Sequence, residues 1–127
     1  MTRKIIMLDS CGVSRELVLG LESKLDCSVE TFKELRVLRN YLASNKVDLA
    51  IINPYKDFFG GLVLTYANFV RNDLKQMDVP VLIFTRTGFD RLTNIAKLVL
   101  GTDYKSYLKK PTPVDEFVEY VSGLLEE

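Results

Sequence analysis

Residues 46–61, KVDLAIINPYKDFFGG, decide the fold of this chain. The part from 47 to 52 is a nearly unbroken apolar run rich in β-branched residues, which is typical of a strand buried on both faces of a parallel sheet. It ends at Asn53 and Pro54, because proline lacks the backbone N–H that a sheet ladder requires. Open α/β sheets bind their ligands just beyond the carboxyl ends of their central strands. The chemistry of the chain, present or lost, is therefore expected at Asn53.

On the amino-terminal side of this stretch, strand and helix patterns alternate. Residues 4–9 and 27–32 are predicted strands, the second short and alternating, as an edge strand is. Ser14 is the predicted N-cap of a helix that reaches about Lys24, and residues 33–45 form a second helix with leucines on one face. Gly20 inside the first helix costs about 1 kcal/mol relative to alanine, so close packing against a neighbour is expected there.

The alternation continues on the carboxyl-terminal side. Predicted helices cover residues 61–75 and 90–100, and predicted strands cover residues 79–85 and 106–109. Pro113 begins a last helix, whose apolar face extends to Leu125. Five strands alternating with five helices predict an α/β fold, a (βα)5 three-layer sandwich with a parallel five-stranded sheet. Right-handed crossovers favour the flavodoxin-like strand order 2-1-3-4-5.

Composition limits the classes of function. A chain of 127 residues with 47% hydrophobic and 27% charged residues is expected to form one domain, residues 1–127. Seventeen basic and seventeen acidic residues cancel, so neither nucleic-acid binding nor membrane insertion is expected. Histidine is absent, and Cys11 and Cys27 lack a CxxC spacing, which argues against a zinc site and a disulfide framework. The expected location is cytoplasmic.

Four signatures give the chain a family resemblance. Asp9 closes the first strand, and Asn53 precedes a Gly-Leu pair at residues 61–62. Thr85 closes the fourth strand, and residues 107–111 read Tyr-Leu-Lys-Lys-Pro, with Lys110 before the proline. Over nearly its whole length the chain resembles the receiver domains of bacterial response regulators, of which the chemotaxis regulator is the simplest. The resemblance implies a signalling domain of a two-component system rather than an enzyme.

The same resemblance shows what this chain lacks. Active receivers hold magnesium with an acidic pair and accept a phosphoryl group on an aspartate; here the pair reads Asp9-Ser10 and the acceptor position reads Asn53. Arg86 follows Thr85 where the family usually has a small residue, so its guanidinium is expected to obstruct a phosphoryl donor. Magnesium requires hard oxygen ligands, and an amide is a far weaker nucleophile than a carboxylate. No magnesium, no other cofactor and no catalytic residue are therefore expected.

An electrostatic consequence follows for the degenerate pocket. A buried carboxylate or ammonium group without a partner costs several kcal/mol. Lys110 and Asp9 are therefore expected to approach one another across Asn53, with Arg86 as a second candidate partner of Asp9. A simpler interpretation of Asn53 also stays open, since asparagine at this position often caps a strand end and bonds the following turn.

Two functions remain open at this stage. The first is a phosphorylation-independent pseudo-receiver that acts by protein–protein interaction, with a partner from a bacterial signalling pathway or as a homodimer. The second is an active phosphoryl-accepting receiver that uses Asp57 or Asp9 in a rearranged pocket. Phe58 and Phe59 are left open between core and contact surface.

The resemblance also implies a switch pair and an output surface. Thr85 and Tyr107 occupy the switch positions, and without a phosphoryl group both are expected to be static. The output surface of the family is formed by its fourth helix, fifth strand and fifth helix, here roughly residues 90–125. Its polar and amphipathic candidates for partner contacts are Arg91, Lys97, Tyr104, Lys105, Tyr107 and Tyr120.

Overall fold

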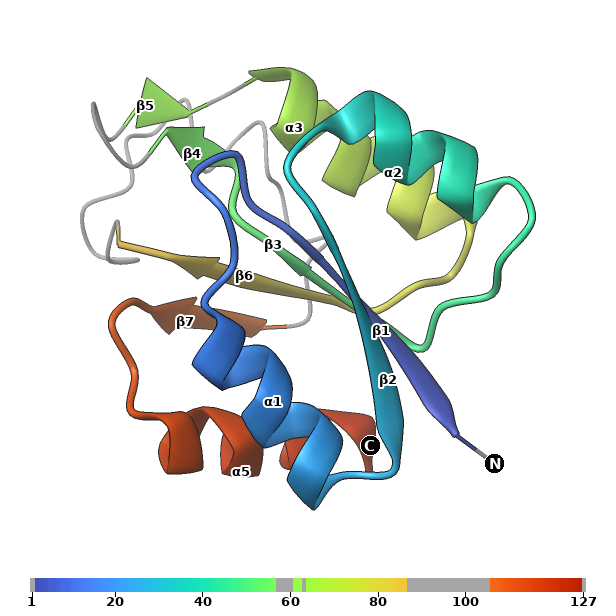
Figure 1. Ribbon diagram of the computed structural model, residues 1–127. Helices are drawn as coiled ribbons and strands as arrows, with labels where there is room; N and C mark the ends of the chain where they lie inside the picture. The colour runs from blue at the N-terminus through green and yellow to red at the C-terminus, as the bar shows by residue number, and fades with distance from the viewer. Residues whose placement is uncertain (1, 57–60, 63, 87–105, 127) are drawn as a thin grey trace.

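A five-stranded parallel sheet forms the centre of the molecule (Figure 1). The computed structural model describes residues 2–56, 61–62, 64–86 and 106–126. The strand order is β2-β1-β3-β6-β7, which is the predicted flavodoxin-like order of the five main strands. The bounds of these strands are Arg3–Leu8 (β1), Cys27–Phe32 (β2), Leu49–Ile52 (β3), Val81–Thr85 (β6) and Ser106–Lys109 (β7).

Helices cover both faces of the sheet, which confirms the three-layer architecture (Figure 1). α1 (Arg15–Lys24) and α5 (Val114–Leu125) lie on one face. On the other face lie α2 (Leu35–Leu42) and α3 (Leu64–Asn68), which continues into the π-helical turn η1 (Phe69–Leu74). None of the described helices has the length and apolar character that crossing a bilayer requires.

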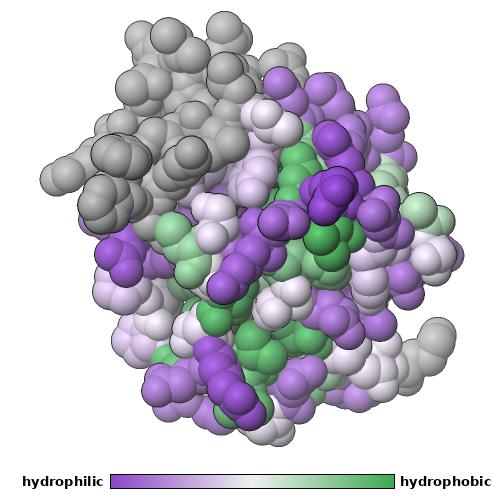
Figure 2. All heavy atoms as spheres, turned by 45° about the horizontal axis from the view of Figure 1, so that its top comes forward, coloured by the Kyte–Doolittle hydropathy of each residue, from purple (hydrophilic) through white to green (hydrophobic). Residues whose placement is uncertain are grey.

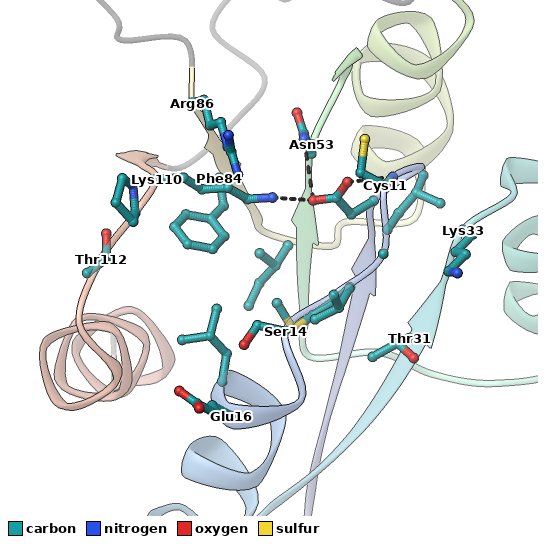
Figure 3. Close-up of a pocket in the computed structure, with 18 of the residues that line it drawn as sticks. Cys11, Ser14, Glu16, Thr31, Lys33, Asn53, Phe84, Arg86, Lys110 and Thr112 are labelled. Atoms are coloured by element: carbon teal, nitrogen blue, oxygen red, sulfur yellow. Dashed lines mark hydrogen bonds and ion pairs between the residues drawn. The ribbon is translucent and has the colours of Figure 1, made fainter. Parts of the chain in front are cut away.

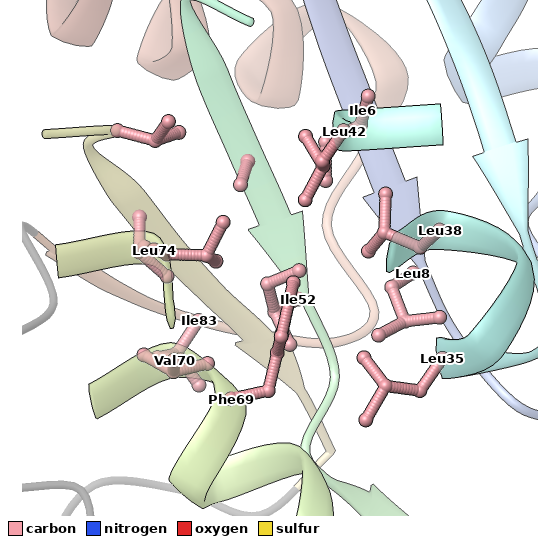
Figure 4. Packing of buried hydrophobic residues seen from close by; sticks show 13 residues of the cluster. Ile6, Leu8, Leu35, Leu38, Leu42, Ile52, Phe69, Val70, Leu74 and Ile83 are labelled. Atoms are coloured by element: carbon pink, nitrogen blue, oxygen red, sulfur yellow. The ribbon is translucent and has the colours of Figure 1, made fainter. Parts of the chain in front are cut away.

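The strands divide their side chains between two cores because successive residues point to opposite faces. Ile5 and Met7 of β1 pack towards α1 and α5, whereas Ile6 and Leu8 pack towards α2 and η1. Figure 4 shows the second core, to which Leu38 of α2 and Phe69 of η1 both belong. On the outer surface shown in Figure 2, hydrophobic residues are visible mainly in a band between hydrophilic ones. Of the two free thiols, Cys11 is exposed and Cys27 is buried.

The contact between α1 and α5 explains the glycine inside the first helix. A Cβ atom on Gly20 would stand 2.6 Å from Cγ1 of Val114 and 3.3 Å from Cγ2 of Val118. The predicted close packing at Gly20 is therefore present. Lys24 and Asp115 add an exposed ion pair between the same helices, and the hydrogen bond from Lys24 lowers the pKa of the Asp115 carboxyl.

Several predicted boundaries differ from the structure, and the helix predicted at 33–45 is shorter, Leu35–Leu42. Residues 61–62 were predicted to begin a helix but form β5 (Gly61–Leu62), which pairs antiparallel with β4 (Tyr55–Lys56). The central strand begins at Leu49 rather than 47. The backbone N–H of Lys4 donates to the Asp48 carboxylate, with an N–Oδ2 distance of 2.7 Å, instead of to a backbone carbonyl of an earlier strand residue. β6 begins at Val81, directly after Pro80, whose missing donor delays the ladder. The predicted helix at residues 90–100 lies outside the described residues.

Candidate functional site

The carboxyl ends of the parallel strands bring the predicted pocket residues to one edge of the sheet (Figure 3). Asp9 follows β1, Asn53 follows β3, Thr85 ends β6 and Lys110 follows β7. Backbone hydrogen bonds continue the ladders by one residue, from the Asn53 N–H to the Leu8 carbonyl at 2.9 Å and from the Lys110 N–H to the Thr85 carbonyl at 2.8 Å. The backbone itself therefore positions these side chains.

The Asp9 carboxylate is the centre of this cluster. It is 4% exposed, and Lys110 Nζ donates to its Oδ2 atom in an ion pair. Asn53 Nδ2 donates to the same oxygen at 3.3 Å, and the Cys11 N–H donates to Oδ1 at 3.0 Å. The pairing of Lys110 with Asp9 across Asn53, which the sequence argument requires, is thus present.

Lys110 brings a positive charge into this largely buried cluster. Its side chain is 18% exposed, and Nζ lies 5.4 Å from the centroid of the Phe84 ring, within reach of a cation–π interaction. The ammonium group therefore compensates the Asp9 charge.

Asn53 has two roles at once. Its Oδ1 atom accepts a hydrogen bond from the Tyr55 N–H at 3.1 Å, which is the turn-capping role that its position before Pro54 suggested. Its Nδ2 atom faces Asp9. An asparagine satisfies both partners here, whereas a carboxylate at this position would have only acceptors and would face Asp9 with like charge.

The remaining pocket residues differ in how they are placed. Ser10 is half-buried, and Arg86 is exposed at the rim of the cleft above Phe84 and Lys110 (Figure 3). The ion pair of Asp9 is with Lys110 rather than with Arg86, the second candidate. Thr85 is fully buried, and its hydroxyl has no hydrogen-bond partner within the described part of the chain.

Two of the predicted output-surface residues, Tyr107 and Tyr120, lie within the described part of the chain. The Tyr107 ring packs against the core beneath α2 and η1, and the Tyr120 hydroxyl forms a hydrogen bond with the Ser106 hydroxyl that joins α5 to β7. Both are half-buried, so both have structural contacts inside the chain. The other predicted contact and acceptor residues lie outside the described residues: Arg91, Lys97, Tyr104, Lys105, Asp57, Phe58 and Phe59.

A cleft of about 1240 Å³ opens beside this cluster. Its walls include the loop between β1 and α1, the end of β2, and the segment that leads into α5, represented by Gly12, Phe32 and Pro113. Sequence reasoning missed this cleft, because its size depends on how far the loop after Asp9 stands from the start of α5. Among the described residues, no group of three or more acidic, cysteine or histidine side chains is arranged to hold a metal ion.

Tyr66 of α3 contacts the loop after β2. Its hydroxyl donates to the Lys33 carbonyl at 3.3 Å. Burial raises the pKa of Tyr66, and the negative charges of Glu34 and Asp9 raise it further. The phenol therefore stays neutral and keeps its proton for this hydrogen bond, which ties α3 to the loop after β2.

Comparison with known proteins agrees with the fold. No model of a known protein family matches the chain, and no curated protein matches it in sequence. Among solved structures, a response regulator from Thermotoga maritima superposes with a TM-score of 0.72 at 18% identity, covering 100% of both chains. The signal receiver domain of an HD domain-containing protein from Pseudomonas fluorescens gives 0.68 at 22% identity, covering 98% of this chain and 88% of that one. The beryllofluoride-activated NtrC4 receiver domain dimer gives 0.69 at 16% identity, with 97% and 96% covered. The chain therefore has the fold of response-regulator receiver domains.

Proposed function

We propose that residues 1–127 form one receiver-like signalling domain that acts by protein–protein interaction and not by metal-dependent phosphoryl transfer. The observation that supports this best is the state of Asp9. Its Oδ2 atom, which an active receiver would offer to magnesium, accepts from Lys110 Nζ and from Asn53 Nδ2.

The donor set argues against a magnesium site. Magnesium binds in near-octahedral geometry through one or two carboxylates, waters and phosphate oxygens. Around this pocket Asp9 supplies one carboxylate, Ser10 and Asn53 supply neutral groups, and the Lys110 ammonium already pairs with the carboxylate. A magnesium ion would therefore find one carboxylate, which it would have to share with Lys110.

The acceptor position argues against a phosphoryl intermediate. Phosphoryl transfer to a receiver requires an ionised oxygen nucleophile, and the Asn53 amide has none. Both of its polar atoms are also engaged, by Asp9 and by the Tyr55 N–H. The chain is accordingly proposed to be a non-enzymatic, cytoplasmic pseudo-receiver that signals through its surface.

The partner surface is proposed from the family's output face. In this chain it comprises β7, α5 and the segment before β7, with Lys97 and Lys105 as contact candidates. The NtrC4 receiver domain was solved as a dimer, which supports a protein partner or a second copy of this chain as the occupant. Reversing both charges, Lys97→Glu with Lys105→Glu, should weaken association in a pull-down or in sedimentation velocity. Lys46→Glu, at the opposite end of the strands, is the matched control.

The proposal is tested by titrating magnesium, and then beryllofluoride, into the ¹⁵N-labelled chain. Backbone amide signals of Asp9, Asn53 and Lys110 should not show specific, saturable shifts. Incubation with radiolabelled acetyl phosphate should leave the chain unlabelled.

The alternative, a working receiver that uses Asp57 or Asp9, predicts the opposite. Base-labile, acid-stable label that disappears in Asp57→Asn or in Asp9→Asn would establish it and overturn the proposal. Base-labile, acid-stable phosphoryl label that persists in both variants would place the acceptor at another residue and would likewise overturn the proposal.

A further inference from the structure

We propose that the cleft beside Asp9 binds a small organic anion, of about the size of a mononucleotide, without covalent chemistry. The inference rests on the proposed function, because it assigns a non-covalent signal to the pocket that no longer takes a phosphoryl group.

The size and walls of the cleft suit such a ligand. Ligand pockets generally measure about 300–1,000 Å³ and combine apolar walls with a few polar groups. At about 1240 Å³ this cleft is larger than that range, so a mononucleotide fits inside it without filling it. Val13, Phe32 and Val114 are half-buried at its sides, so they offer apolar surface that a ligand can cover.

The charges around the cleft favour an anion. Among the described residues of the lining, Lys110 compensates Asp9, and the other charged side chains are Lys33, Arg86 and Glu16. These described residues carry an excess of one positive charge. Neither Lys33 nor Arg86 forms an ion pair within the described part of the chain, so both are available to an incoming phosphate or carboxylate.

The two basic side chains also set the length of the ligand. Lys33 follows β2 and Arg86 follows β6, and they lie on opposite sides of the cleft (Figure 3). Strands β2, β1, β3 and β6 are neighbours in that order, and three interstrand steps of about 4.8 Å place the two ends roughly 14 Å apart. A bare phosphate contacts one end, whereas a mononucleotide is long enough to reach from one end towards the other.

The Lys33 side chain is already held at the rim. Gly12 has a φ of +95°, and a Cβ atom on it would lie 3.3 Å from Lys33 Cε and 3.8 Å from Nζ. The lysine therefore rests on the loop between β1 and α1, next to the cleft, rather than extending into solvent elsewhere. Less of its conformational freedom is lost when it binds an anion.

The test uses adenosine monophosphate as the probe, with adenosine and inorganic phosphate as its uncharged and ring-free counterparts. Each is titrated to about 5 mM into the ¹⁵N-labelled chain in EDTA. Adenosine monophosphate should give saturable shifts at Gly12, Lys33 and Arg86, weakened by added NaCl. Because the probe has one phosphate and the two cations lie roughly 14 Å apart, one of the variants Arg86→Gln and Lys33→Gln should raise the dissociation constant about fivefold, the effect of losing roughly one exposed ion pair, and the other should change it less. Lys46→Gln, an equal charge loss at the far end of the strands, should leave it unchanged.

Three outcomes would overturn the inference. The first is the absence of saturable shifts at the cleft with adenosine monophosphate. The second is equal binding of adenosine, which would mean that charge has no role. The third is equal binding of inorganic phosphate, which would reduce the cleft to a general anion site. Urea unfolding of each variant shows whether it is folded, so a change in its dissociation constant cannot be assigned to misfolding.

The outcome is independent of the preceding proposal. Covalent labelling by acetyl phosphate would refute the loss of phosphoryl transfer and leave binding of adenosine monophosphate in EDTA intact. Failure of that binding would leave the pseudo-receiver proposal standing.

Discussion

Replacing Lys110 by methionine tests the electrostatic account of the pocket directly. The substitution keeps an unbranched apolar stem near the Phe84 ring but removes the ammonium group that pairs with Asp9. The carboxylate, 6% exposed in its side chain, would then keep only neutral donors. We expect the folded state to lose stability at pH 7.

The magnitude follows from the geometry. Breaking a buried ion pair by removing one partner generally costs about 3–5 kcal/mol. Here the loss is smaller, about 2–3 kcal/mol at pH 7, because Lys110 is 18% exposed and Asp9 keeps the donors Asn53 Nδ2 at 3.3 Å and Cys11 N at 3.0 Å.

The assay is a double-mutant cycle measured by urea unfolding with circular dichroism. Lys110→Met, Asp9→Asn and the double variant are compared with the natural chain, and the coupling free energy should be about 2 kcal/mol. Lys109→Met is the matched control, because Lys109 is exposed and precedes Lys110 directly. It should change the free energy of unfolding by less than about 0.5 kcal/mol.

Two results would refute the reasoning. If Lys110→Met and Asp9→Asn are additive, the two charges do not stabilise one another. If Lys110→Met costs no more than Lys109→Met, the loss does not come from the ion pair with Asp9.

Three further predictions concern the acceptor position, the helix contact and the buried thiol. Asn53→Asp should cost about 2–4 kcal/mol in EDTA, because two carboxylates then face one ammonium, and about 10 mM Mg²⁺ should restore the melting temperature of this variant alone. Gly20→Ala should lower the free energy of unfolding by about 1–3 kcal/mol, since its Cβ would stand 2.6 Å from a valine methyl of α5. Gly123→Ala is the control: nothing lies within 4 Å of its Cβ, so the same urea unfolding assay should show a gain of about 0.5–1 kcal/mol. Burial raises the pKa of the Cys27 thiol above its ordinary value of 9.0, so this thiol ionises at lower pH in the unfolded chain than in the folded one. The free energy of unfolding should therefore fall as the pH rises past 9.0, and Cys27→Ala should reduce this alkaline loss. Ellman's reagent should label the exposed Cys11 well before the buried Cys27.

The strand order could be predicted from sequence because it depends on simple patterns. Buried parallel strands are nearly continuous apolar runs, and β1, β3 and β6 all have them. The position of Asp9, Asn53 and Lys110 at one edge followed from that order alone. Their mutual bonds followed from the cost of leaving a buried charge unpaired.

Other features had no readable signal. The apolar residues at 66, 69, 70 and 74 fit an α-helical pattern, but the backbone at 69–74 is π-helical, a difference of one residue per hydrogen-bonded turn that periodicity does not resolve. Asp78 adopts a φ of +59°, where glycine or asparagine is the usual residue, so the end of that helix was not marked. The cleft depends on tertiary placement of two loops, which no local pattern encodes.

The Asp9 carboxylate accepts from three segments of the chain that are distant in sequence: the loop just after it, the end of the central strand and the end of the edge strand. This convergence has a consequence for how the site can evolve. Placing an acid at 53 alone adds repulsion to Asp9, and removing the lysine alone leaves the existing acid without its countercharge. Each of these single changes is therefore expected to lower stability in the absence of a metal ion, so substitutions at 53 and at 110 constrain one another through Asp9.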